Sequence, residues 1–233
     1  VEFVRSEIFI LKFPWMTPGV GLGTSFVSPI IGVYGISFLI IWMGMLSLSN
    51  ARSKWVGVVG LIILVVATFA QPFRSTVIEE EVKVLAVQAE GAGHQTLIEL
   101  ASGVEGSLDA IVFPEYSYSY DVREIGSLLS DLKELSSRTG ATLVLGTKTD
   151  HKDGSWQNTA LSLDGDGLLG IHYKNHTVHF FDDGVAGSEA KAIDTPRGKI
   201  GTPICFDNDY EDVVRRMTID GADVYKIKVT KDE

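Results

Sequence analysis

The stretch Lys199-Ile-Gly-Thr-Pro-Ile-Cys-Phe-Asp207 places a thiol at the end of a short apolar run. Cys205 is the only cysteine in the 233 residues. A free cysteine most often serves as a small buried hydrophobic side chain. At the end of a strand, with an acid and a lysine brought in from other parts of the chain, the same thiol would be a nucleophile. The rest of the sequence decides between these two interpretations.

Apolar runs and helical periods alternate along the chain around this stretch. In the segment 122–138, apolar residues recur at the three- and four-residue spacing of an amphipathic helix. Strand–helix–strand alternation followed by hairpins predicts an α/β layered sheet. The predicted strands are 82–88, 109–113, 142–146, 160–163, 168–173 and 199–205, and the predicted helices are 94–105, 122–138 and 210–219.

Charge divides the chain into two parts. Residues 1–78 carry five Lys or Arg against two Asp or Glu, a net charge of +3. Residues 79–233 carry fifteen against twenty-eight, a net charge of −13, and the two parts give the −10 of the whole chain. Because affinity for nucleic acid rests on neutralising phosphates, we expect no nucleic-acid partner for the acidic part. A single cysteine allows no internal disulfide.

The first part contains two uncharged runs, VSPIIGVYGISFLIIWMGMLSL at 27–48 and WVGVVGLIILVVATFA at 55–70. About 20 apolar residues span a bilayer, so we predict two transmembrane helices in a membrane segment over 1–78. A buried core helix of a soluble protein is the alternative. The connection between the runs holds Arg52 and Lys54, and short basic connections stay in the cytoplasm. We therefore expect the part from 79 to 233 on the extracytoplasmic side.

Three ionisable residues follow predicted strands: Glu115 after Val-Phe-Pro, Lys174 after His-Tyr, and Cys205 after Thr-Pro-Ile. Taken singly, they have ordinary explanations as a solvated loop acid, a surface lysine and a core cysteine. Taken together, they supply a nucleophile, a base for its proton and a cation for the thiolate. A thiol is mostly protonated near neutral pH and needs such help to attack. The tetrahedral intermediate also needs positive charge or donors at its oxygen.

The ordered motifs Phe-Pro-Glu115, Tyr-Lys174 and Ile-Cys205-Phe resemble the Glu-Lys-Cys triad of the nitrilase (carbon–nitrogen hydrolase) superfamily, over about residues 82–224. The resemblance implies an αββα sandwich and catalysis through a thioester. It also implies that Glu115 is the general base, Lys174 stabilises the thiolate and the oxyanion, and Cys205 is the nucleophile.

Two further acids are carried over from this resemblance. The superfamily places one glutamate eight residues after the lysine and another two residues after the cysteine, where this sequence has Asp182 and Asp207. Aspartate is one methylene shorter, and we expect both as supporting residues, with a solvated loop acid as the alternative for each. No cofactor and no metal are expected, because the spacing of His172, His176 and His179 does not by itself make a metal site.

Two predicted apolar helices precede this domain. With them, the chain resembles one family within the superfamily, the apolipoprotein N-acyltransferases. That family transfers an acyl chain from a phospholipid to the N-terminal diacylglyceryl-cysteine of a lipoprotein. The resemblance implies a place in the bacterial inner (cytoplasmic) membrane, with the catalytic domain on the periplasmic side. One alternative is a membrane-tethered amidase or nitrilase that uses water as the acceptor. The other is a non-catalytic membrane-tethered binding domain.

The chain starts at Val1 rather than at a methionine and stops at Glu233. We expect a fragment at both ends, with a truncated catalytic domain over 79–233. The acyltransferase family has several more membrane helices than two and further elements after the position of residue 224, which agrees with this expectation.

Overall fold

The computed structural model describes residues 3–9, 17–22, 27–49, 52–69, 82–89, 91–104, 106–180 and 182–223. The chain divides into two compact units, Val1–Val77 and Ile78–Glu233, and each is described here by itself. The predicted domain boundary after residue 78 and the segment 224–233 lie outside the described residues.

Two apolar helices make up most of the described part of the first unit. Gly57 lets them approach closely, because a Cβ at this position would lie 2.5 Å from the carbonyl oxygen of Met43. Small residues at such contacts are typical of helices that pack in membranes. The helices of this unit are η1 (Val4–Ile8, a π-helical turn), α1 (Pro18–Gly21), α2 (Ser28–Ser47) and α3 (Ser53–Phe69).

By length and composition, one of the described helices can cross a membrane, over Ile30–Ser47 within α2. Large apolar side chains such as Phe38 and Trp42 are exposed on it. α3 is also apolar but shorter, over Ser53–Ala67. Both predicted helices are therefore present, and only α2 has the length of a membrane span among the described residues. Their arrangement as a transmembrane hairpin stays a prediction.

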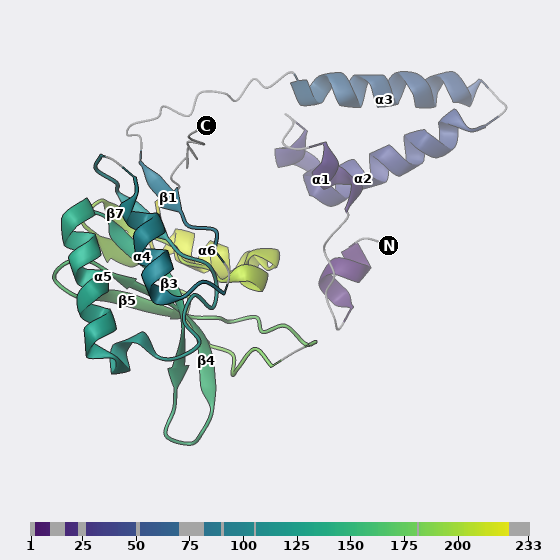
Figure 1. The fold of residues 1–233 in the computed structure, drawn as a ribbon. Helices are drawn as coiled ribbons and strands as arrows, with labels where there is room; N and C mark the ends of the chain where they lie inside the picture. Colours follow the sequence, from purple (N-terminus) through teal and green to yellow (C-terminus); the bar gives the residue numbers. More distant parts are fainter. Residues whose placement is uncertain are drawn as a thin grey trace. The chain divides into compact units, whose positions relative to one another are not determined.

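A mixed five-stranded sheet organises the second unit, in the order β1-β2-β3-β4-β5 (Figure 1). β1, β2 and β3 are parallel, whereas β3, β4 and β5 are antiparallel neighbours. A separate antiparallel pair, β6 and β7, follows. Strands and helices alternate along this unit, which confirms the predicted α/β class. The strands are β1 (Val84–Ala86), β2 (Ala110–Val112), β3 (Thr142–Asp150), β4 (Trp156–Leu163), β5 (Leu168–Tyr173), β6 (Ile193–Thr195) and β7 (Gly198–Ile200).

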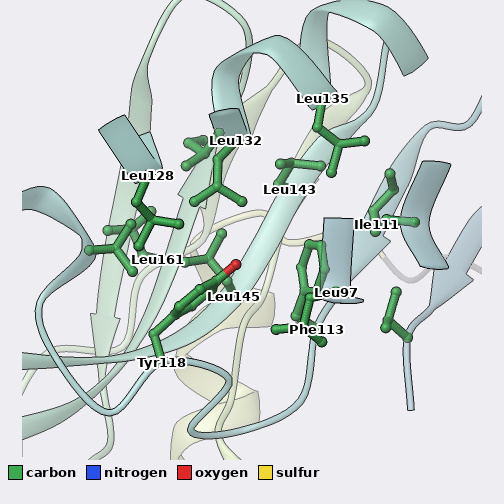
Figure 2. Close-up of a cluster of buried hydrophobic side chains, with 14 of the residues drawn as sticks. Leu97, Ile111, Phe113, Tyr118, Leu128, Leu132, Leu135, Leu143, Leu145 and Leu161 are labelled. Carbon is green, nitrogen blue, oxygen red and sulfur yellow. The ribbon is translucent and has the colours of Figure 1, made fainter. Parts of the chain in front are cut away.

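The hydrophobic core lies between one face of this sheet and the helices α4 (His94–Ser102) and α5 (Gly126–Thr139). Successive side chains of a strand point to opposite faces, so every second residue of the strands reaches this core. Figure 2 shows how the leucines of the helices meet those of the strands. The labelled core residues are Leu97, Ile111, Phe113, Tyr118, Leu128, Leu132, Leu135, Leu143, Leu145 and Leu161.

The opposite face of the sheet borders a cavity of about 530 Å³. Val84, Val112 and Val144 line this cavity from the strands, and Met217 lines it from α6 (Glu211–Ile219). Parallel strands are ordinarily covered on both faces. In an αββα sandwich this apolar face is the one that packs against the second sheet.

Several predicted elements differ from the structure. β3 ends four residues after the predicted strand 142–146, β4 begins four residues before the predicted strand 160–163, and β6 was not predicted. The single helix predicted at 122–138 is a short 3-10 turn, η2 (Val122–Glu124), followed by α5, because Ile125 has an extended backbone that separates them. The strand predicted at 199–205 ends at Ile200, where its pairing with β6 ends. Pro203 lacks the N–H that a longer ladder would need.

Removing a core side chain tests this packing. We expect Leu143→Ala to lower the free energy of unfolding by about 2–5 kcal/mol, because Leu143 is fully buried in the core and the substitution leaves a cavity. The half-exposed Leu168 in β5 provides the matched control, and Leu168→Ala is expected to have a much smaller effect. Denaturant unfolding followed by tryptophan fluorescence measures both. Equal losses for the two variants would contradict the assignment of Leu143 to the core.

Candidate active site

Polar side chains on three strands, or just after them, meet at one end of the strands of the sheet. β2 and β5 run in the same direction, so the residues that follow them, Glu115 and Lys174, lie at the same end. β4 lies beside β5 in the opposite direction and brings Asn158, near its start, to this end. The backbone N–H of Lys174 donates to the carbonyl of Asn158 at 2.9 Å. Strand direction alone therefore gathers the polar groups at one place.

Lys174 is the centre of this cluster, with only 1% of its side chain exposed. Its Nζ lies 2.9 Å from Oε1 of Glu115 and 2.8 Å from Oδ2 of Asp183. Burial by itself would lower the pKa of Lys174, but the hydrogen bonds with Asp183 and Glu115 outweigh it and raise that pKa. The structure thus holds a buried, charged ammonium between two carboxylates.

The acid beside the lysine is Asp183 rather than the predicted Asp182. Asp183 is buried, and its Oδ2 also accepts from the backbone N–H of Val178 at 2.9 Å. Burial would raise the pKa of Asp183, yet the hydrogen bond from Lys174 and those from its other partners hold it below the usual range. Asp182 instead lies at the surface, where the indole N–H of Trp156 approaches its Oδ2 at 3.4 Å. The structure thus places Asp183, held by the backbone N–H of Val178, at the ammonium of Lys174, one residue after the predicted Asp182.

The loop that carries Glu115 crosses β3 at Gly146. A Cβ on Gly146 would lie 2.5 Å from the carbonyl oxygen of Pro114 and 2.6 Å from the backbone nitrogen of Tyr116, so only glycine fits. Tyr116 itself has a left-handed backbone, with φ 56°. Its hydroxyl donates to Asp183, which connects the loop after β2 to the loop after β5. Such backbone conformations are costly for residues other than glycine and gather at functional sites.

Cys205 is the first residue of η3 (Cys205–Asp209) and is exposed. It has the second left-handed non-glycine backbone among the described residues, with φ 45°. Cys205 and Glu115 line the same cavity. Desolvation by the surrounding chain raises the pKa of the thiol, the charge of Glu115 adds to this effect, and the charge of Lys174 opposes it. The resting thiol is therefore protonated at neutral pH and needs a base to become a nucleophile.

Asp207 is fully buried and ties the cysteine turn to the lysine loop. Its Oδ2 lies 3.0 Å from Nε2 of His172 and accepts from the backbone N–H of Ile204 at 3.1 Å. Its Oδ1 accepts from the backbone N–H groups of Asn175 and His176, at 3.0 and 2.8 Å. The shorter aspartate reaches these groups because the chain just after Lys174 lies directly against the cysteine turn.

Sequence reasoning missed two residues of this site, Asn158 and Asp183, and considered His172 without predicting its contact with Asp207. His172 is a polar residue within the predicted strand 168–173, which is an available signal, whereas Asn158 precedes the predicted strand 160–163. Nothing local distinguishes Asp183 from Asp182. Within the described residues the structure contains no cluster of three or more metal-ligating side chains.

Acid titration tests the role of Asp207. Burial would raise the pKa of Asp207, but the hydrogen bonds from His172 and from backbone N–H groups lower it below the unfolded value. The charged carboxylate therefore stabilises the fold above the unfolded pKa, near 3.9, and this contribution is lost as the pH falls through the lower folded pKa. We expect Asp207→Asn to cost about 1–3 kcal/mol of unfolding free energy at neutral pH.

The difference in unfolding free energy between wild type and Asp207→Asn should shrink as the pH falls below about 4. Chemical unfolding at a series of pH values measures it. Asp166→Asn, at an exposed turn, serves as the control and should follow the wild-type curve. Parallel curves for wild type and Asp207→Asn would contradict a stabilising charge at Asp207.

Comparison with known proteins places this arrangement in a family. Residues 84–231 match the family model of the carbon-nitrogen hydrolases. Apolipoprotein N-acyltransferase from Geobacter metallireducens is 24% identical over 286 aligned positions, which cover 100% of this chain and 54% of that protein. The chain therefore spans about half the length of this curated relative.

Solved structures of a carbon-nitrogen hydrolase and of a member of the nitrilase superfamily are similar to this chain. Nit3 of Saccharomyces cerevisiae, a member of branch 10 of the nitrilase superfamily, superposes with a TM-score of 0.52 at 25% identity, over 60% of this chain and 61% of that chain. A carbon-nitrogen hydrolase from Helicobacter pylori gives a TM-score of 0.52 at 20% identity, over 60% and 57%. These similarities confirm the predicted nitrilase-like α/β fold. Because the family model matches residues 84–231, more than half of the chain, the chain belongs to the carbon-nitrogen hydrolase family.

Proposed function

We propose that this protein is a membrane-anchored N-acyltransferase that moves an acyl chain from a phospholipid to the N-terminal diacylglyceryl-cysteine of a lipoprotein. The observation that carries the proposal is the alignment with an apolipoprotein N-acyltransferase over the whole chain, apolar helices included. The polar cluster alone would serve an amidase equally well. A helix long enough to cross a membrane, over Ile30–Ser47, gives access to substrates that are themselves anchored in lipid.

In the first half-reaction, Sγ of Cys205 attacks the carbonyl carbon of the phospholipid ester, and the thiol proton passes to the carboxylate of Glu115. The ammonium of Lys174 stabilises the negative oxygen of the tetrahedral intermediate. When the intermediate collapses, the carbon–oxygen bond breaks, and Glu115 returns the proton to the departing lysophospholipid alkoxide. A thioester on Cys205 remains. The protonated resting thiol and the adjacent carboxylate support this route of general base catalysis.

In the second half-reaction, the α-amino group of the lipoprotein attacks the thioester carbonyl. Glu115 accepts the proton that the amine loses, and the carbon–sulfur bond breaks to give an amide. The released thiolate takes the proton back from Glu115, so the enzyme returns to its starting state. Lys174 keeps its proton throughout, because two carboxylates contact its ammonium group.

The proposed location is the bacterial inner membrane, with the second unit on the periplasmic side. It rests on the relative named above, on the apolar helix α2, and on the basic pair Arg52 and Lys54 that follows it. Water is the alternative acceptor. Cys205 is exposed, so water can reach a thioester there, and the protein would then be a membrane-tethered amidase or nitrilase.

Incubation of the full chain in membranes with acyl-labelled phospholipid tests the nucleophile. We expect label on the protein that hydroxylamine removes, because hydroxylamine cleaves thioesters, and we expect Cys205→Ala to lose it entirely. Addition of a diacylglyceryl-cysteine peptide should transfer the label from the wild-type protein to the peptide amine. Label is followed by gel fluorography and by mass spectrometry of the peptide.

Two results would contradict this proposal. Label that persists in Cys205→Ala would exclude a thioester on this residue. Turnover of small amides by a wild type that takes no label from phospholipid would favour the hydrolase instead.

A substitution at Gly146 tests the placement of Glu115 without removing any reacting group. In Gly146→Ala the new methyl group would collide with the backbone of Pro114 and Tyr116, so the loop that carries Glu115 must shift. Misplacement of a reacting group by about 1 Å can cost about 100-fold in rate, and we expect a loss of this order in thioester formation. Gly126→Ala is the matched control, since an added Cβ there meets nothing within 4 Å. Equal rates for the two variants would show that Glu115 does not depend on this crossing.

A further inference from the structure

Asn158 is a buried amide in β4, with 1% of its surface exposed. Its Nδ2 lies 2.7 Å from Oε1 of Glu115 and 3.0 Å from Oδ1 of Asp183. It also lies 2.9 Å from the hydroxyl of Tyr116. This one amide group therefore contacts both carboxylates that flank Lys174.

The chemistry of these partners fixes the orientation of the amide. A carboxylate only accepts hydrogen bonds, so the NH₂ group of Asn158 must face Glu115 and Asp183. Its Oδ1 is buried and has no hydrogen-bond partner within the described part of the chain. An unpaired buried acceptor costs free energy, and such groups in a native fold require an explanation. The orientation toward the acids is thus retained at a cost in stability.

The two oxygens of Glu115 have different surroundings. Oε1 accepts from Nδ2 of Asn158 at 2.7 Å and from Nζ of Lys174 at 2.9 Å. Both of these donors contact the same oxygen, and the thiol of Cys205 interacts with the same carboxyl group. We propose that Asn158 is a positioning residue that, together with Lys174, occupies Oε1 and so leaves Oε2 as the oxygen that exchanges protons with Cys205. This inference rests on the proposed function in one respect only, the role of Glu115 as base.

The surroundings of Glu115 determine how its titration responds to a substitution. Lys174 faces it from the end of β5, Cys205 from η3, and Tyr116 from its own loop. Asp183 faces the same ammonium from the loop after β5. Removal of the Asn158 amide takes away a hydrogen bond that favours the charged carboxylate and leaves every charge in place. The proton affinity of Glu115 must then rise.

Titration of Glu115 in the resting protein tests the proposal directly. Difference infrared spectroscopy of the full chain in detergent follows the carboxyl band, and its absence in Glu115→Gln assigns it. Asn158→Leu has a similar shape and no donor, and Asn158→Ser has a hydroxyl too short to reach Glu115. In each variant that folds, we expect the midpoint of the pH dependence of this carboxyl band to lie higher than in the wild type, because the lost hydrogen bond favours the charged form.

Gln157→Ala is the matched control, because Gln157 precedes Asn158 in β4 and its side chain bonds His151, away from the cluster. Its midpoint should equal that of the wild type. A residue with only a structural role would lower stability without moving the midpoint. Coincident titration curves for the wild type and a folded Asn158 variant would therefore overturn the proposal.

Acylation by a short-chain nitrophenyl ester separates this proposal from the proposed function. Intact mass spectrometry detects the acyl group on Cys205, and the rate is measured against pH. In the Asn158 variants the acid-side decline of the rate should move to higher pH by the same amount as the infrared midpoint. A wild type that forms no adduct on Cys205 would contradict the proposed function, whereas the infrared titration would still decide the role of Asn158.

Discussion

The ammonium of Lys174 is the constraint on which the rest of the site depends. A buried lysine without partners loses its charge, since desolvation disfavours the ammonium. Here two carboxylates contact it, from Glu115 and Asp183, and they belong to loops 68 residues apart in the chain. Both loops must therefore fold so that their carboxylates reach the same ammonium group. Gly146 makes room for the first loop, and the backbone N–H of Val178 holds the acid of the second.

Cys205 approaches Glu115 of this cluster from a separate turn. Lys174 and Asp183 are buried and Glu115 is partly buried, whereas the thiol is exposed on a left-handed backbone at the start of a 3-10 turn. Its position relative to the lysine comes from Asp207, whose carboxylate binds backbone groups on both sides. In the proposed mechanism Lys174 and Glu115 supply the chemistry, and the buried Asp207 positions the turn that carries Cys205. A protonated thiol beside a carboxylate agrees with a base that acts during the reaction rather than with a resting thiolate.

Much of this arrangement could be predicted from sequence because its signals are local. Apolar runs predicted the strands of the second unit, the three- and four-residue spacing of apolar residues predicted a helix, and Glu115 and Lys174 were each expected just after a strand. The predicted bounds of helices and strands were wrong where contacts between residues distant in sequence determine where an element ends. Ile125 breaks a continuous helical pattern because the chain turns there, and the strand before Cys205 ends at Ile200 because its partner β6 ends. The roles of Glu115, Lys174 and Cys205 in catalysis stay predictions.

The sequence by itself determined the α/β alternation, the apolar helices at the start, and the order of acid, lysine and cysteine on which the resemblance to the family rests. Only the tertiary structure decided that Asp183 and not Asp182 contacts the lysine, that Asn158 joins the two acids, and that Asp207 bridges the lysine and cysteine loops. The reason is physical. Periodicity and strand direction follow from neighbouring residues, but hydrogen bonds and ion pairs form only within about 3 Å to 4 Å, and such distances between remote loops are set by the folded backbone.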